Sequence, residues 1–251
     1  LIDLLEDEIT EVQIAAIRAA AKIRAPELIP YLFGKLSYPR TRPDATVAIA
    51  QCTRENLSVL EEILRDEAQP IVVRRQLTHI LQQQSSAQAV RILSKSFDDS
   101  DDSYRVEAYQ ALLNLRADGH QLPISNTRLR EVLTKEFHIA YALFVQRQDI
   151  VEGTKTNGTG EKPPRSDMLL FEALEKQIQQ AEDRILSLIA ILYPDLPIGA
   201  VRESLAKDDS RLRATAIELI DNVADSKVKE FLLPLIGSSH NERLHVAQRK
   251  L

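Results

Sequence analysis

Five arginines lie at or near the same position of a segment that recurs along the chain. The guanidinium group is a rigid, permanently charged fork that binds carboxylates and phosphates through paired hydrogen bonds. A row of such groups could form a track for acidic peptides or phosphates. It could also form a ladder of ion pairs within the fold, and the nearness of aspartates in the sequence favours the ladder. The candidate interaction residues are Arg42, Arg74, Arg75, Arg105 and Arg213.

The other polar groups lack the spacing that catalysis or metal binding requires. The stretch GTKTNGTGEK at 153–162 does not have the glycine–lysine–serine/threonine order of a phosphate-binding loop. The histidines have no metal-ligand spacing. The aspartates at 98–102 suit the start of a helix better than a calcium loop. We therefore predict no enzyme activity, no catalytic or metal-binding residue and no cofactor.

The composition favours an all-helical protein in a reducing compartment. Only seven glycines and no tryptophan in 251 residues disfavour a β-sandwich or a glycine-looped nucleotide fold. A net charge of −5 argues against nucleic-acid binding. The single cysteine, Cys52, has no internal disulfide partner, which suits the cytoplasm. No apolar run is long enough to span a membrane and no signal peptide is visible, so we expect no membrane insertion by this chain.

A twelve-residue apolar pattern recurs along the chain at intervals of 29 to 32 residues, except for 108 residues between the fourth and fifth copies. The full copies begin at Val12, Thr41, Val72, Tyr104 and Leu212, and a truncated copy begins at Leu244. The fifth position is usually alanine, and the ninth is alanine, isoleucine or leucine. Positions one, five and nine share a helix face, where small residues let helices approach closely.

A second apolar stretch precedes most copies. These stretches lie at 28–36, 57–64, 89–97, 199–206 and 228–236. The segment between each apolar stretch and the copy that follows contains aspartate, serine, proline and glycine. Several of these residues can cap the following helix. The repeating unit is thus a helix pair, which has to stack on its neighbours to bury both faces. We predict an all-α fold, a right-handed α-solenoid, that is, an α-α superhelix.

The repeat is interrupted at 125–194 by two longer helical patterns. The first begins at Ser125 and the second ends at Pro194. Between them, residues 153–166 contain almost nothing apolar, so we predict a flexible linker there. The interpretation is a long antiparallel helical hairpin inserted between repeats at 1–124 and repeats at 195–251.

The chain resembles the HEAT-repeat family, in its short variety of about thirty residues. The resemblance lies in the period, in the helix pairs and in a second helix with a D-x-x-R-x-x-A-like pattern. The resemblance covers most of 1–124 and 195–251. It implies a non-catalytic protein-interaction or regulatory scaffold with protein partners that the sequence does not identify.

A narrower resemblance covers roughly 125–237. A long helix, ILYP, a short helix, RLRATAIELIDNV and FLLPLI follow one another. This order is similar to the soluble HEAT region of bacterial membrane proteins whose transport domain resembles ADP/ATP translocases of the major-facilitator type. It implies a cytoplasmic segment of a membrane-embedded parent chain, and the apolar patterns cut at Leu1 and Leu251 suit a piece of a longer protein. Two alternatives stay open: a free-standing HEAT adaptor, and a protein resembling phycobilin lyases that acts on a tetrapyrrole.

Overall fold

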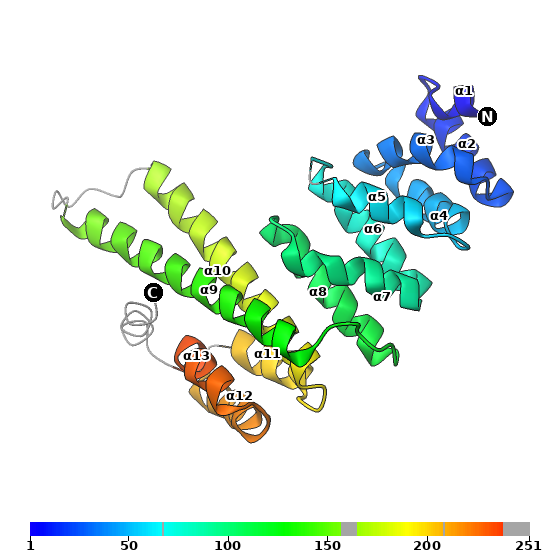
Figure 1. Ribbon diagram of the computed structural model, residues 1–251. Helices are drawn as coiled ribbons and strands as arrows, with labels where there is room; N and C mark the ends of the chain where they lie inside the picture. Colours follow the sequence, from blue (N-terminus) through cyan, green and yellow to red (C-terminus); the bar gives the residue numbers. More distant parts are fainter. Residues whose placement is uncertain (67, 157–164, 208, 238–251) are drawn as a thin grey trace. The chain divides into compact units, whose positions relative to one another are not determined.

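The computed structural model consists of helices arranged in two compact units, Leu1–Pro123 (unit 1) and Ile124–Leu251 (unit 2) (Figure 1). It describes residues 1–66, 68–156, 165–207 and 209–237, and of 151–156 and 165–167 only the backbone. Within these ranges there is no strand, so the all-α prediction is confirmed for the described part of the chain. The predicted hairpin and the C-terminal repeats fall in the same unit.

Unit 1 alternates between a short first helix and a longer second helix. The second helices are α2 (Thr10–Ile23), α4 (Arg42–Cys52), α6 (Ile71–Gln84) and α8 (Asp102–Ala117). They cover the first four copies of the recurring segment. The first helices are α1 (Ile2–Leu5), α3 (Ile29–Phe33) between the 3₁₀ turns η1 (Pro26–Leu28) and η2 (Gly34–Ser37), α5 (Ser58–Arg65), and α7 (Ala87–Leu93), which continues into η3 (Ser94–Asp98).

The second helices of unit 1 pack against one another in chain order, α2 on α4, α4 on α6 and α6 on α8. The first helices α3, α5 and α7 each contact the second helix that follows. The apolar columns read from the sequence are buried within this stack. The buried residues at the fifth and ninth positions are Ala16, Ala20, Ala45, Ile49, Ile80, Ala108 and Leu112. Burial of these columns accounts for the recurrence of the pattern, since each copy provides a surface for the next.

Aspartate caps two of the second helices. The Asp101 side chain accepts a hydrogen bond from the backbone N–H of Tyr104, at the start of α8. Asp209 accepts from the N–H groups of Arg211 and Leu212, at the start of α12 (Ser210–Val223). These bonds satisfy N–H groups that have no partner within the helix. The residues that precede second helices α2, α4 and α6 make no side-chain bond of this kind.

Unit 2 begins with the two longest helices of the described chain, which pack against each other (Figure 1). Glu136 and Arg147 on the first pair with Arg184 and Glu175 on the second, so the two helices are antiparallel. The helices of unit 2 are α9 (Asn126–Thr156), α10 (Arg165–Leu192), α11 (Ile198–Ala206), α12 (Ser210–Val223) and α13 (Ser226–Gly237).

The long helices extend into the predicted linker at 153–166, because α9 continues to Thr156 and α10 begins at Arg165. The rest of that linker, 157–164, lies outside the described residues, as does the truncated repeat that begins at Leu244. The segment at 212–223 forms α12, as its pattern predicts, and the apolar stretches before and after it form α11 and α13.

Asp225, in the turn between α12 and α13, joins three parts of unit 2. One carboxylate oxygen accepts hydrogen bonds from Arg130 of α9 at 2.9 Å and from the Tyr193 hydroxyl, just after α10, at 2.7 Å. The other accepts from the backbone N–H groups of Lys227 and Val228, at the start of α13, at 3.1 Å each. Partial burial raises the pKa of Asp225, but the hydrogen bonds from Tyr193, Val228 and Arg130 outweigh burial and lower it to about 2.

The lowered pKa of Asp225 predicts an acid-sensitive contribution to stability. An unfolded aspartate titrates near pH 4, so the contribution is complete above about pH 4 and declines as the pH falls towards about 2. Because this side chain is partly exposed, we expect a loss of about 1 kcal/mol. Urea unfolding of the wild type and of Asp225→Asn between these pH values measures it. The wild type should lose its advantage over the variant as the pH falls, and a constant difference between them would contradict the assignment.

Candidate interaction site

Three second helices of unit 1 make the same side-chain hydrogen bond to the loop before them. In each case a side chain in the first turn donates to a backbone carbonyl six residues earlier, at or just after the end of the first helix. Such carbonyls have no partner within their own helix. The pairs are Gln13 with Asp7 at 2.6 Å, Arg42 with Leu36 at 2.8 Å, and Arg105 with Asp99 at 2.7 Å. Arg42 and Arg105 thus stabilise the loop that precedes the second helix of their own repeat.

Arg74 is fully buried between two repeats. Its guanidinium group pairs with Asp99 of the following repeat and lies 3.8 Å from the centroid of the Tyr104 ring. Burial raises the pKa of Tyr104 to about 12, with opposing contributions from Thr78 and Arg74, so the ring stays neutral under the cation. This arginine therefore binds a neighbouring loop and is not on the surface.

Two further predicted arginines of unit 1, Arg75 and Arg105, also lie beside carboxylates. Arg105 pairs with Asp102 at 2.5 Å in addition to its carbonyl contact. Arg75 is 3.4 Å from Glu107 of the next second helix, and both side chains are half-buried. Arg74, Arg75 and Arg105 thus have the arrangement of an ion-pair ladder, whereas Arg42 binds carbonyl oxygens.

The difference in burial between the neighbours Arg74 and Arg75 gives a test. We expect Arg74→Ala to lower the free energy of unfolding by about 3 kcal/mol, because it leaves the Asp99 carboxylate partly buried without its partner. Arg75→Ala, which removes a pair that solvent still reaches, should cost less than about 1 kcal/mol. Denaturant unfolding followed by circular dichroism compares the two variants. Equal losses of unfolding free energy would show that the difference in burial between the two arginines does not affect their contributions to stability.

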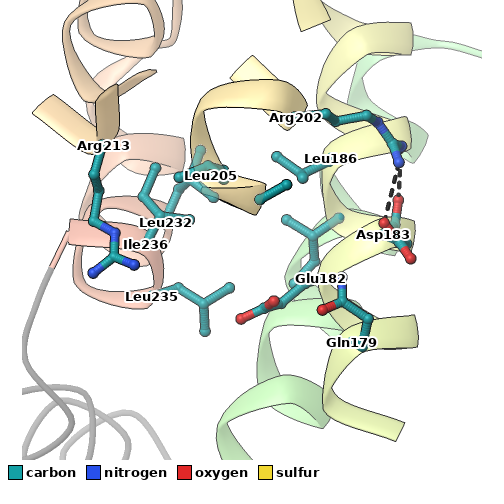
Figure 2. Close-up of a pocket in the computed structure, with 12 residues that line it drawn as sticks. Gln179, Glu182, Asp183, Leu186, Arg202, Leu205, Arg213, Leu232, Leu235 and Ile236 are labelled. Carbon is teal, nitrogen blue, oxygen red and sulfur yellow. Dashed lines mark hydrogen bonds and ion pairs between the residues drawn. The ribbon is translucent and has the colours of Figure 1, made fainter. Parts of the chain in front are cut away.

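The fifth predicted residue, Arg213, lies elsewhere: it lines a cavity of about 560 Å³ within unit 2 (Figure 2). Leu186 of α10, Leu205 of α11, and Leu232 and Leu235 of α13 form its apolar part. Cavities of about 300 to 1,000 Å³ are typical of ligand sites. Of the five arginines predicted from the sequence, Arg213 is the one that the structure places at this cavity.

Charged side chains surround the apolar part. Arg202 of α11 donates to Asp183 of α10 at 3.1 Å (Figure 2). It also donates to the Ser187 hydroxyl of α10 at 2.7 Å, and these bonds hold α11 to α10. Glu182 of α10 also lines the cavity. In the view of Figure 2, Leu235 lies between the Glu182 carboxylate and the Arg213 guanidinium group. The lining thus brings apolar side chains and charged groups of both signs together.

Sequence reasoning did not identify Glu182, Leu205 or Leu235. Each belongs to an amphipathic helix pattern that equally suits burial in a core. The only sequence signal at this cavity was Arg213, through its position in the recurring segment.

No known protein-family model matches the sequence, and no curated protein matches it either. Within the described residues, no group of three histidine, cysteine, aspartate or glutamate side chains is placed to hold a metal ion. Of the helices in the same residues, none is both long and apolar enough to cross a membrane.

Proposed function

We propose that this protein is a non-catalytic interaction or regulatory scaffold that binds a protein partner at the cavity of unit 2. The observation that carries the proposal is the cavity itself, which apolar side chains and charged groups of both signs from four helices line. Protein-binding sites commonly combine an apolar centre with a polar rim, and arginine is over-represented among the residues that dominate their affinity.

A solenoid of HEAT-like repeats is the architecture that we propose for this scaffold. The chain-order packing of α2, α4, α6 and α8 supports it, as does burial of the same columns in successive copies. In unit 2 the pair α11 and α12 and the following α13 continue the pattern, with Ala216 and Ile220 buried at the fifth and ninth positions. Helical repeats of this type present extended surfaces to partners.

The narrower resemblance extends the proposal to a cytoplasmic arm of a transporter-like membrane protein. The long hairpin of α9 and α10, followed by the shorter helices α11 to α13, supports it. The encoding reading frame tests it directly: a series of apolar segments of membrane-spanning length upstream of Leu1 is the expected result. A frame without such segments would favour the free-standing adaptor.

The scaffold proposal predicts a partner whose binding depends on Arg213. With the wild-type chain as bait in an extract of the source cells, we expect a protein whose recovery falls about tenfold with Arg213→Glu. Arg211→Glu is the matched control, because Arg211 is an exposed arginine of the same helix that does not line the cavity. Quantitative mass spectrometry of the retained proteins measures the difference. Equal recovery with both variants, or catalytic turnover by the purified chain, would contradict the proposal.

A further inference from the structure

We propose that the first helix pair of unit 1, α1 and α2, is the contact surface of a symmetric dimer of this chain. In this contact the α2 helices of two copies lie antiparallel across a two-fold axis. The surface is separate from the cavity of unit 2, and its test is independent of the scaffold function. Three features of α1 and α2 support the dimer: the position of one helix face, its apolar character, and the charges at the two ends of α2.

The later second helices of unit 1 bury one face against the second helix before them. On α4 and α8, the residues at the first, eighth and twelfth positions of the recurring segment are at most 7 % exposed, namely Thr41, Ala48, Cys52, Tyr104, Ala111 and Leu115. The Cys52 thiol of α4 lies 3.8 Å from the Ala20 carbonyl oxygen of α2. On α6 the matching residues lie one place later, and Gln84 there donates to the Ala50 carbonyl of α4 at 2.7 Å.

The same face of α2 has no second helix before it within unit 1. Its residues at these three positions are Val12, Ala19 and Ile23, all apolar, and Ile23 is 61 % exposed. Leu4 of α1 and Ile9, just before α2, are 48 % and 57 % exposed. The two helices lie at one end of the row of helix pairs in unit 1 (Figure 1). Exposed apolar side chains gathered on one helix pair are typical of an interaction surface.

The charges at the two ends of α2 favour a second, antiparallel copy as the occupant. Glu6 and Glu8 lie just before α2, and Lys22 and Arg24 lie at its end. All four residues are exposed, and none of them makes an ion pair in the part of the chain that the structure describes. Across a two-fold axis perpendicular to the helices, the acidic start of each α2 lies beside the basic end of the other. A parallel contact would instead bring like charges together.

The dimer should be weak, because one helix pair offers less surface than a standard interface. Such interfaces bury about 800 Å² on each partner, so we expect a dissociation constant of about 10 µM. Sedimentation equilibrium of the full 251-residue chain, at concentrations about tenfold above and below that value, measures it.

A substitution on the apolar face tests which surface forms the contact. Ile23→Gln should weaken the dimer about tenfold, because the symmetric contact buries this side chain twice. Val47→Gln is the matched control, because Val47 is 57 % exposed and belongs to α4, outside the first helix pair. The control should keep the wild-type dissociation constant. Circular dichroism checks that both variants keep the fold.

Charge exchange between the two ends of α2 tests the antiparallel orientation. Glu6→Lys together with Glu8→Lys places basic residues at both ends, and should weaken the dimer about tenfold. Lys22→Glu together with Arg24→Glu places acidic residues at both ends, with the same expected loss. The chain with all four substitutions exchanges the two ends. It should associate within about threefold of the wild type, because opposite charges meet again.

A chain that stays monomeric throughout the concentration range would overturn the inference. A dimer that Ile23→Gln and Val47→Gln affect equally would also overturn it, as would failure of the fourfold exchange to restore association. With any of these results, the Arg213-dependent capture of a partner would still decide the scaffold function.

Discussion

Each helix pair in this protein depends on a neighbour, because a single pair cannot cover both faces of its second helix. Unit 1 meets this constraint with buried side chains one turn apart on its second helices, and on α4 and α8 these are an alanine and a larger aliphatic residue. Ala45 and Ile49 of α4 and Ala108 and Leu112 of α8 are all fully buried. Because the same contact recurs, each copy shapes the surface on which the next one packs. A change in one copy therefore also affects the fit of its neighbour.

The arginines show how one residue type serves different roles at related positions. Arg42 binds carbonyls that close its own loop, whereas Arg74 is enclosed between repeats with Asp99 and the Tyr104 ring. Arg213 lies at the wall of a cavity. The flexible stem and five donors of the guanidinium group permit all three. The contribution of each arginine to stability differs, because the amount of water around its charge, and hence the effective dielectric constant, differs.

The sequence was sufficient to predict the helix content and the positions of the second helices, because burial repeats with a fixed period. It also placed Asp101 in a segment suited to the start of a helix. It could not predict that the first helix of the second repeat divides into η1, α3 and η2, which depends on local packing and on prolines. Nor could it predict the bond between Arg130 and Asp225, which are 95 residues apart. The cavity was also unpredictable, because its volume depends on how four helices meet.

The buried pair of Glu136 and Arg184 has a mechanical consequence for the hairpin of α9 and α10. Both side chains are almost completely shielded from water and lie 2.8 Å apart. If one helix slid along the other by a turn, two charges would be separated inside an apolar interior, at a large energetic cost. This ion pair therefore resists sliding of one helix along the other, and a force applied to one helix acts on both.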